Sequence, residues 1–345
     1  MTGESQDLRA FEERMRLQIE AYHEAALVYA AVKLDLPDKM GERTWTVEQL
    51  AGALGTSAPH LFRFLRGLAT LGICRELPDG TFALAPGGWS LRSDSHSRLN
   101  KKVQIVVEQY WRPWSDLVSC LKTGKPAFDH VFGMNVTDWR RENAAQGLMF
   151  ATYLTDETFA HAGSILEVLE CGAEAKKVAD IGGGCGALLT PLLIAFPHLT
   201  GVLFETPHMI DMAIPFLRVF DQFHLLDRIE LVPGDFFEGV PVKVDLYLLK
   251  NVLQQWNDAE ALAILHNVRS AMPEGARLAI IERLMPERSA DDPAAIMVDL
   301  HMMTITGGRT RSVAEFAALL REAGLTPAKT TSTTSGLAVI EAVRG

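Results

Sequence analysis

The sequence predicts an α/β protein with a doubly wound, largely parallel sheet in its carboxyl-terminal part, preceded by a smaller, mostly helical domain. From residue 178 onward, short apolar runs typical of buried strands alternate with helical patterns. Before residue 100 the pattern is helical and ends in a hairpin signal. The 345 residues also exceed the usual size of one domain. We therefore expect two domains, 1–98 and 99–345.

The composition argues against several functional classes. A formal net charge of −10 and a pI near 5.5 disfavour nucleic-acid binding, which depends on releasing counterions from phosphates. No apolar run is long enough to span a membrane, and the amino-terminal segment lacks the features of a signal peptide, so we expect a cytoplasmic protein. The four cysteines lie far apart without metal-ligand spacing, so we expect reduced thiols and no metal site.

The first domain begins with a long helical pattern over residues 8–33 that is apolar on more than one face, which suggests a second partner. Thr46 and Gln49 form a capping box that predicts a helix over 47–54, and a second helix is expected over 58–71.

Two short strands, 73–77 and 81–84, flank the turn signal 78–80 and predict a hairpin. Helix, helix and hairpin make a winged-helix arrangement, for which DNA binding and a scaffold or dimerisation role are the two interpretations. The second helix carries few cations, chiefly Arg63 and Arg66, so dimerisation is favoured.

Residues 101–165 have a helical pattern that is rich in large side chains. Such a segment can simply be core, or it can cover a flat aromatic ligand, since ligand pockets are lined mainly by apolar and aromatic groups. Both interpretations stay open at this point.

The run from Val178 to Ala187 is the strongest functional signal. An apolar strand ends in a turn with glycines at 182, 184 and 186, and an apolar helix, 188–195, follows at once. Such a turn allows close backbone approach to a ligand at a helix N-terminus. Glu205 closes the next apolar strand, where a ribose-binding carboxylate belongs in a Rossmann-like fold. The sequence therefore predicts an adenosine-containing cofactor.

A dinucleotide and S-adenosylmethionine both fit the glycine spacing. Three features favour S-adenosylmethionine. Asp180, two residues before the first glycine, suits an ammonium group and would repel a pyrophosphate. Asp235 and Phe236 follow a third strand and suit an adenine amine and ring. A fourth strand ends in a cation, Lys250.

Several motifs in order make the chain similar to small-molecule O-methyltransferases of the caffeate and hydroxyneurosporene type. They are the runs 178–186, 204–208, 234–237, 248–258, 299–303 and 307–311, with Glu315 and Phe316 after them. The resemblance implies an S-adenosylmethionine cofactor and a homodimer formed through the first domain. It also implies that Gly182, Gly184, Glu205, Asp235 and Phe236 bind the cofactor, with Lys250 nearby. Asp180 and Gly183 complete the expected cofactor-binding set.

The chain departs from that family at two positions. Gln254 and Gln255 stand before Trp256 where the family has a His-Asp pair, so the usual general base is absent. Thr310 stands where many relatives have a glutamate that orients the histidine, whereas Glu282 matches the other supporting acid. We expect Gln254 to hydrogen-bond the acceptor and Glu282 to fix its surroundings.

His301 lies on a helix that the resemblance places along the substrate pocket. It can act as a wall residue that hydrogen-bonds the substrate, as a replacement base, or, less favourably, as a metal ligand. We expect an aromatic acceptor to be lined by six further residues: Trp111, Phe128, Met149, Tyr153, Met302 and Thr306.

Three functions of different classes remain. The first is methyl transfer to an aromatic or heteroaromatic metabolite, at oxygen, nitrogen or carbon. The second is a related enzyme that binds the same cofactor but decarboxylates, hydroxylates or rearranges its substrate. The third is a ligand-sensing regulator that uses the winged helix, which the acidic charge disfavours.

Overall fold

A computed structural model describes residues 3–172, 174–220 and 224–344. The chain divides into two compact units, Met1–Arg112 and Pro113–Gly345. This division falls later in the chain than the expected boundary at 98/99, so residues 99–112 belong with the N-terminal unit.

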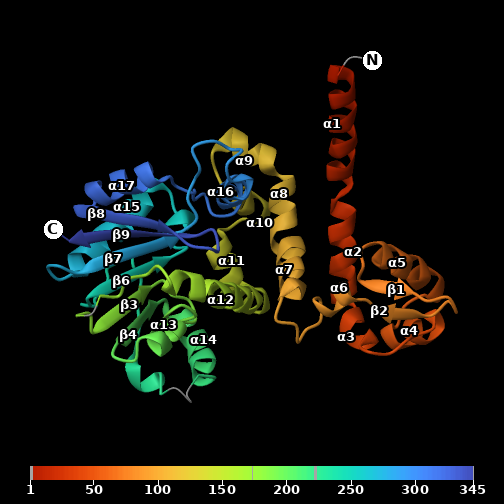
Figure 1. Cartoon of the computed structure of the whole chain (residues 1–345), viewed down its shortest axis with the longest axis horizontal. Coiled ribbons are helices and arrows are strands. Elements are labelled where there is room, and N and C mark those ends of the chain that lie inside the picture. The colour runs from red at the N-terminus through yellow and green to blue at the C-terminus, as the bar shows by residue number, and fades with distance from the viewer. Residues whose placement is uncertain (1–2, 173, 221–223, 345) are drawn as a thin grey trace. The chain divides into compact units, whose positions relative to one another are not determined.

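The N-terminal unit has the predicted order of helix, helix and hairpin (Figure 1). Its elements are α1 (Gly3–Glu20), α2 (Tyr22–Lys33), α3 (Leu36–Met40), α4 (Val47–Leu54), α5 (Ala58–Thr70), β1 (Cys74–Glu76), β2 (Phe82–Leu84), α6 (Pro86–Trp89), α7 (Leu99–Ile105) and the π-helical turn η1 (Val106–Tyr110). The Thr46–Gln49 capping box is present, and α4 and α5 start at the predicted residues. The single helix expected over 8–33 is instead two helices that break at Ala21.

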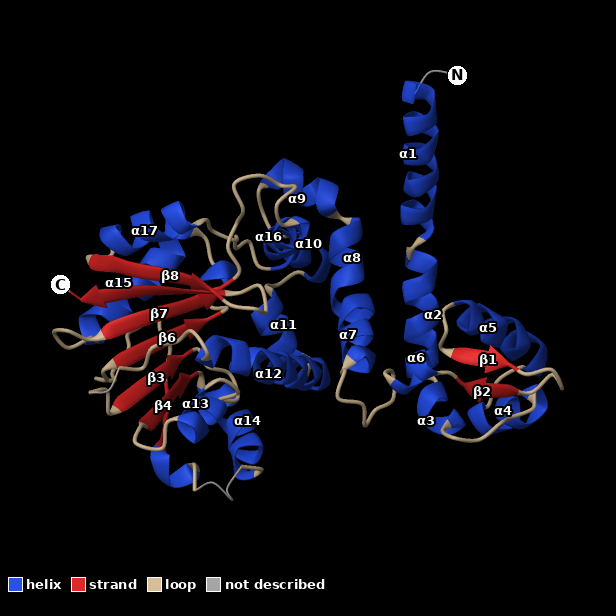
Figure 2. Cartoon of the chain, viewed as in Figure 1, coloured by secondary structure: helices blue, strands red, loops and turns tan. Residues whose placement is uncertain are grey.

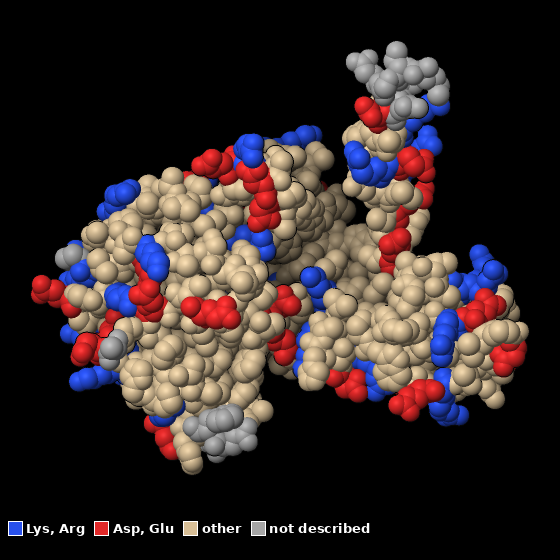
Figure 3. All heavy atoms as spheres, in the orientation of Figure 1, with Lys and Arg blue, Asp and Glu red and all other residues tan. Residues whose placement is uncertain are grey.

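The core of the N-terminal unit lies between α2, α4, α5 and the antiparallel β1–β2 hairpin. Leu50, Leu65, Leu68 and Phe82 are fully buried in it. On the face shown in Figure 3, acidic and basic side chains are interspersed over this unit. The helix α1 contributes no side chain to this core within the described residues, and its residues Leu8, Phe11, Leu17 and Ile19 remain exposed.

The second unit is an α/β fold built on a seven-stranded sheet (Figure 2). Its strands are β3 (Lys177–Ile181), β4 (Thr200–Glu205), β5 (Ile229–Pro233), β6 (Leu246–Lys250), β7 (Arg277–Glu282), β8 (Leu325–Ser332) and β9 (Ala338–Arg344). The order is β5-β4-β3-β6-β7-β9-β8, parallel from β5 to β7, with β9 antiparallel to both neighbours. The doubly wound architecture is confirmed, and β8 is a strand that the sequence pattern did not predict.

Helices cover both faces of this sheet, and further helices lie beyond its strand ends. Their bounds, with those of two 3-10 turns, are α8 (Trp111–Ser115), α9 (Leu117–Thr123), α10 (Ala127–Phe132), α11 (Val136–Glu142), α12 (Ala144–Leu166), α13 (Leu189–Ala195), α14 (Pro207–Arg218), η3 (Leu226–Arg228), η4 (Leu253–Gln255), α15 (Asp258–Ala271), α16 (Pro293–Ile305) and α17 (Val313–Glu322). One core packs α15 and α17 on the sheet, and the other packs α12, α13 and α14 on the opposite face.

The helices α9, α10, α11 and α16 lie beyond the carboxyl ends of the parallel strands (Figure 2). There α16 contacts α9 and α10. Among the described residues, none of the helices is both long enough and apolar enough to cross a membrane.

Candidate active site

The carboxyl ends of the parallel strands gather the polar residues that the sequence singled out. The order in which successive strands are added to the sheet reverses at β3, since β4 lies on one side of it and β6 on the other. In open α/β sheets, ligands bind outside the strand ends at such a switch point. The residues at or just after these ends are Asp180, Glu205, Asp235, Lys250 and Glu282.

The glycine turn after β3 has the predicted permissive geometry. Gly182 and Gly184 have φ values of +68° and +59°, a region that disfavours other residues. A Cβ on Gly183 would lie 2.5 Å from Cγ of Asp180, so a side chain there would collide with the carboxylate. A Cβ on Gly184 would meet nothing within 4 Å. The turn thus presents its backbone to an open space.

Asp180 is only 1% exposed, and its Oδ1 has no hydrogen-bond partner among the described residues. Burial raises the pKa of this carboxyl to about 7, although the nearby Lys250 favours the charged form. A buried, unpaired carboxylate is costly unless a cation reaches it. The site therefore fits a ligand that brings an ammonium group to the glycine turn.

Glu205 is fixed at the end of β4 by two main-chain donors. Gly184 N–H donates to Oε1 over 3.2 Å, and Thr206 N–H donates to Oε2 over 2.7 Å. Burial raises the pKa of Glu205, and these two hydrogen bonds oppose that shift. Each carboxylate oxygen can accept a further hydrogen bond, which suits a pair of ribose hydroxyls.

Phe236 is held in an aromatic group beside the glycine turn. Its ring centroid lies 5.0 Å from that of Phe237 and 6.2 Å from that of Trp256. A Cβ on Gly182 would lie 3.5 Å from the Phe236 ring, which puts the ring next to the turn. The preceding Asp235 is exposed, and its Oδ1 accepts the Phe237 N–H over 2.8 Å. An exposed carboxylate and a held ring suit an adenine.

Lys250 ends β6 in a largely buried position. Its Nζ donates to Oγ1 of Thr158 on α12 over 3.1 Å. Burial lowers the pKa of Lys250 to about 8, while Asp180, Glu157 and Glu282 favour its charged form. The lysine therefore supplies a cation among three carboxylates, on the side of β3 opposite to Glu205.

Two buried side chains hold the loop that carries Gln254. The main-chain N–H of Gln254 donates to Oε1 of the fully buried Glu282 over 2.9 Å. Arg311, 1% exposed, donates to the carbonyls of Leu253 and Trp256, over 2.9 Å each. Within the described residues, the side-chain amide of Gln254 makes no hydrogen bond with the protein. Sequence reasoning gave Arg311 no role, although it lies in a quoted motif.

Gly308 allows the loop after α16 to approach this segment. A Cβ there would lie 2.1 Å from the carbonyl oxygen of Gln254, so only glycine fits. The approach brings the end of α16 toward residue 254, since the Gly308 N–H also donates to the hydroxyl of Thr306 over 3.1 Å. Thr306 is half-buried, and its hydroxyl donates to the carbonyl of Met302.

His301 on α16 pairs with a residue that the sequence did not single out. The indole N–H of Trp114 donates to Nδ1 of His301 over 3.1 Å, and the two rings stack at 6.2 Å. Burial lowers the pKa of His301 to about 4, and Arg140 adds to this effect. Since Nδ1 accepts a hydrogen bond, the neutral ring carries its proton on Nε2. His301 is therefore a hydrogen-bond donor at that atom.

The remaining expected substrate residues lie in different surroundings. Phe128 is fully buried among Phe132 and Trp139, with ring centroids 4.5 Å and 5.7 Å away, which favours the core interpretation for this residue. Met149 and Tyr153 are half-buried on α12. Trp111 falls in the N-terminal unit, where its ring meets Tyr22 edge-on at 6.2 Å.

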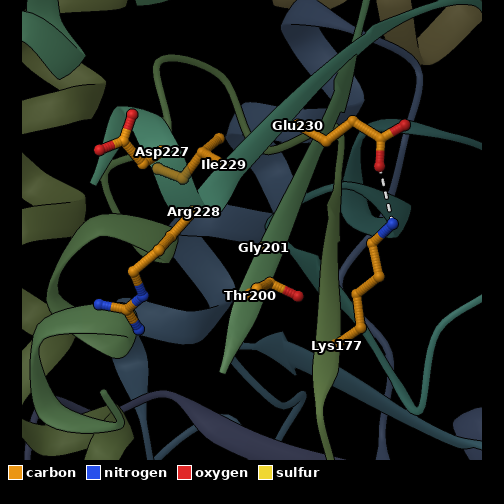
Figure 4. Close-up of a pocket in the computed structure, with 7 residues that line it drawn as sticks. All are labelled: Lys177, Thr200, Gly201, Asp227, Arg228, Ile229 and Glu230. Atoms are coloured by element: carbon orange, nitrogen blue, oxygen red, sulfur yellow. Dashed lines mark hydrogen bonds and ion pairs between the residues drawn. The ribbon is translucent and has the colours of Figure 1, made fainter. Parts of the chain in front are cut away.

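A hollow of about 290 Å³ lies at the opposite ends of the strands (Figure 4). Lys177, Thr200 and Ile229, which start β3, β4 and β5, line it with their neighbours. Nζ of Lys177 donates to Glu230 over 2.7 Å, and the Arg228 guanidinium donates to main-chain carbonyls. This hollow is a feature of the sheet's amino-terminal edge, remote from the glycine turn.

Four thiols and the acidic residues complete the inventory of chemical groups. Cys74, Cys120, Cys171 and Cys185 are buried and unpaired. Over residues 3–172, 174–220 and 224–344, no three histidine, cysteine or acidic side chains come together as a metal site would need. Asp180, Glu205, Asp235, Lys250 and Glu282, which we call the strand-end residues, thus define an α/β enzyme that binds an adenosyl cofactor.

Comparison with known proteins agrees with this class. A family model described as an O-methyltransferase domain matches residues 114–326. The O-demethylpuromycin-O-methyltransferase of Streptomyces alboniger is 34% identical over 91% of this chain and 83% of its own length. The 8-amino-8-demethylriboflavin N,N-dimethyltransferase of Streptomyces davaonensis is 33% identical over 87% of this chain and 86% of its own.

Solved structures give the same answer. The mitomycin 7-O-methyltransferase superposes with a TM-score of 0.92 at 31% identity, covering 99% of this chain and 100% of its own. An O-methyltransferase from neocarzinostatin biosynthesis, solved with S-adenosylmethionine and 2-hydroxy-5-methyl naphthoic acid, has a TM-score of 0.80 at 27% identity over 93% and 96% of the two chains. The chain belongs to the O-methyltransferase family and is an S-adenosylmethionine-dependent methyltransferase.

Proposed function

We propose that this enzyme methylates an aromatic or heteroaromatic small molecule of secondary metabolism, at a group that ionises readily. The observation that supports the proposal most is that the strand-end residues stand together with Gln254, which occupies the position of the family's general base. The substrates named for its relatives, which include puromycin, riboflavin and naphthoate derivatives, support an aromatic acceptor.

Loss of the histidine base is compatible with methyl transfer. A sulfonium is already a good leaving group, so the main task is to hold the nucleophile in line, which can contribute about 7–11 kcal/mol. A general base contributes typically about 10²–10⁴-fold, or roughly 3–5 kcal/mol. Positioning is the larger effect. Suitable acceptors are an acidified phenol beside a carbonyl, an aromatic nitrogen or an electron-rich ring carbon, whereas a phenol with a pKa near 10 is a poor one.

The cofactor supplies an electrophilic methyl group when it is bound. We assign Asp180 to its ammonium group, the backbone of Gly182, Gly183 and Gly184 to close approach, and Glu205 to its ribose hydroxyls. Asp235 and Phe236 bind the adenine, and Lys250 places a positive charge near Asp180. The orphaned Oδ1 of Asp180 and the two N–H donors that fix Glu205 support these roles.

At the acceptor, we assign hydrogen bonding to the side chain of Gln254 and to Nε2 of His301. The neutral state of His301 supports a donor in place of a base. Met149, Tyr153 and Met302 line the acceptor with Thr306, and the buried Phe128 supports that lining from the core.

We also propose a homodimer formed through the N-terminal unit. The helix α1 carries large apolar side chains that stay exposed: Leu8, Phe11, Leu17 and Ile19, from 48% to 72%. Monomeric proteins seldom expose such a row, and a second copy of the unit would bury it. Leu17→Glu together with Ile19→Glu should give a monomer by sedimentation. A dimer that persists at low micromolar protein would count against this interface.

The test of function is transfer of a radiolabelled methyl group from S-adenosylmethionine to a panel of hydroxynaphthoates, phenazines and quinones. We expect transfer to acidic members of the panel and a product heavier by one methyl group. Binding of the cofactor without transfer to any acceptor, with a product of another mass change, would instead favour the decarboxylating, hydroxylating or rearranging alternative.

A further inference from the structure

Three polar atoms at or beside the Gln254 loop are buried without a partner among the described residues. One is the indole Nε1 of Trp256. The other two are Oε2 of Glu282 and Oγ1 of Thr310, on side chains that are 0% and 1% exposed. Nearly all buried polar atoms in native proteins are hydrogen-bonded to protein or ordered water, so each exception calls for an explanation. The oxygens of Glu282 and Thr310 therefore need a partner that the described residues do not supply.

The chain brings these two groups to the same loop. Glu282 ends β7, and Leu284, two residues later, forms a parallel bridge with Arg311. Thr310 directly precedes Arg311. Glu282 binds the main chain of Gln254, and Arg311 binds the carbonyls on either side of that residue. Both residues that carry the orphaned oxygens therefore neighbour contacts to the segment that holds Gln254.

The other groups of Glu282 and Thr310 are already used. Oε1 of Glu282 accepts the Gln254 N–H over 2.9 Å, and the Thr310 N–H donates to Asp299 over 2.7 Å. Only the second carboxylate oxygen and the hydroxyl remain to be satisfied. A carboxylate oxygen accepts, whereas a hydroxyl both donates and accepts, so one water molecule can join them.

We propose that Glu282 takes up the proton of the acceptor, relayed by one water molecule bound between Oε2 of Glu282 and the hydroxyl of Thr310. This inference rests on the proposed function and identifies where the proton goes in the absence of the usual histidine. Glu282 thereby positions and receives the proton without touching the acceptor itself.

The proton balance of this step is simple. The acceptor O–H bond breaks, and its proton passes to the water, which gives one of its own protons to Oε2 of Glu282. The electron pair stays on the acceptor oxygen and would form the new bond to the methyl carbon, while the carbon–sulfur bond of the bound sulfonium would break and leave its electron pair on sulfur. Glu282 ends as a neutral carboxylic acid and returns its proton to solvent after product release.

Four charged or dipolar groups act on Glu282. Burial disfavours its charged form, whereas the Gln254 N–H, Arg311, the Leu253 N–H and Lys250 favour it, and the pKa is raised to about 7. A proton acceptor works best when its pKa lies near the operating pH. Glu282 is therefore suited to acceptors that ionise near neutrality.

The first test compares Glu282→Gln and Thr310→Val with the wild type on phenols whose pKa values span about 6 to 10. We expect Glu282→Gln to lower kcat/KM by about 10²-fold or more for an acceptor with a pKa near 8, and much less for one already ionised. Thr310→Val should give a smaller loss of the same kind. Equal losses for both classes of acceptor would overturn the proposal.

Thr190→Val is the matched control. Thr190 is also fully buried with an unpartnered hydroxyl, but it lies on α13, away from the Gln254 loop. Its substitution should change kcat/KM equally for neutral and ionised acceptors. A selective loss in this variant would show that any buried hydroxyl has the same effect, and would contradict the role of Thr310.

The second test needs no turnover. Infrared difference spectra, recorded between about pH 5 and 9 with S-adenosylhomocysteine present, should contain a protonated carboxyl signal that titrates near neutrality. Glu282→Gln should remove the part of this signal that belongs to Glu282, and Thr310→Val should shift that part, whereas a contribution from Asp180, whose pKa is also raised to about 7, stays in both variants. If the wild type methylates no acceptor, the proposed function fails while this titration still decides the state of Glu282. A Glu282 signal that does not move with pH, or that Thr310→Val leaves unchanged, would overturn the proposal.

Discussion

The main-chain N–H of Gln254 donates to Oε1 of Glu282 over 2.9 Å and ties the loop after β6 to the end of β7. The bond uses the backbone of residue 254, so its side chain can change without breaking it. Oε2 of Glu282 remains unpartnered. The structure thus retains an acid that can orient a new side chain at position 254.

The first prediction concerns Gln254→His. Glu282 can accept a hydrogen bond from the new imidazole, so the variant should gain a general base. We expect methylation of ordinary phenols, with a pKa near 10, to rise by about 10²-fold or more, because a base contributes most when the acceptor is neutral. Initial rates on such a phenol, measured for wild type and variant, check this.

The neighbouring glutamine provides the control. Gln255 is exposed, and its side-chain amide donates to the carbonyl of Asn251 over 2.8 Å. Gln255→His introduces the same imidazole outside the reach of Glu282. An equal gain in both variants would show that position 254 has no special relation to the acceptor.

The second prediction concerns the cofactor. Glu205→Ala removes a carboxylate that two N–H groups hold in place, and should weaken S-adenosylmethionine binding by roughly 10- to 100-fold, the effect expected for hydrogen bonds to a charged group. Calorimetry measures the change in Kd. Glu230→Ala, which removes an exposed glutamate at the other edge of the sheet, should leave Kd unchanged. Equal affinity of Glu205→Ala and wild type would show that the ribose lies elsewhere.

The third prediction is a pH dependence of stability. The folded-state pKa of Glu282 is raised to about 7 from 4.5, so folding favours its protonated form. The associated stability is fully present below about pH 4.5 and is lost as the pH rises through about 7. Asp180, also raised to about 7, acts in the same direction.

Urea unfolding at several pH values tests this sign. The free energy of unfolding of the wild type should fall between about pH 5 and 8, and Glu282→Gln should reduce the fall by roughly 1–3 kcal/mol. Asp180 keeps part of the dependence in the variant. Parallel pH profiles for the two proteins would contradict a titrating Glu282.

Local sequence signals predicted the elements whose ends are fixed by hydrogen bonds between a side chain and the backbone. The Thr46–Gln49 capping box is formed, and its helix begins where expected. Strand ends were equally predictable, because an apolar run that stops at a polar residue marks both the strand and its exposed edge. This is why the acids at the carboxyl ends of β3 and β4 could be grouped from the sequence, whereas the role of Glu282 was implied by the resemblance.

Other features depend on contacts that no local pattern carries. The strand β8 (Leu325–Ser332) is mostly exposed and rich in threonine, and it forms through pairing with β9. The break at Ala21 has no glycine or proline to announce it. Trp114 and His301 are 187 residues apart, so their hydrogen bond is a consequence of tertiary packing alone.

The last prediction concerns that pair. Because Trp114 donates to Nδ1, His301 should stay neutral above about pH 5 with its proton on Nε2, and the pH profile of methyl transfer should contain no histidine limb. Nitrogen NMR shifts of the imidazole, assigned with His301→Gln, report the tautomer. Trp114→Phe removes the indole N–H and should mix the two tautomers. A wild-type ring protonated on Nδ1 would reverse the assignment and return His301 to the role of a base.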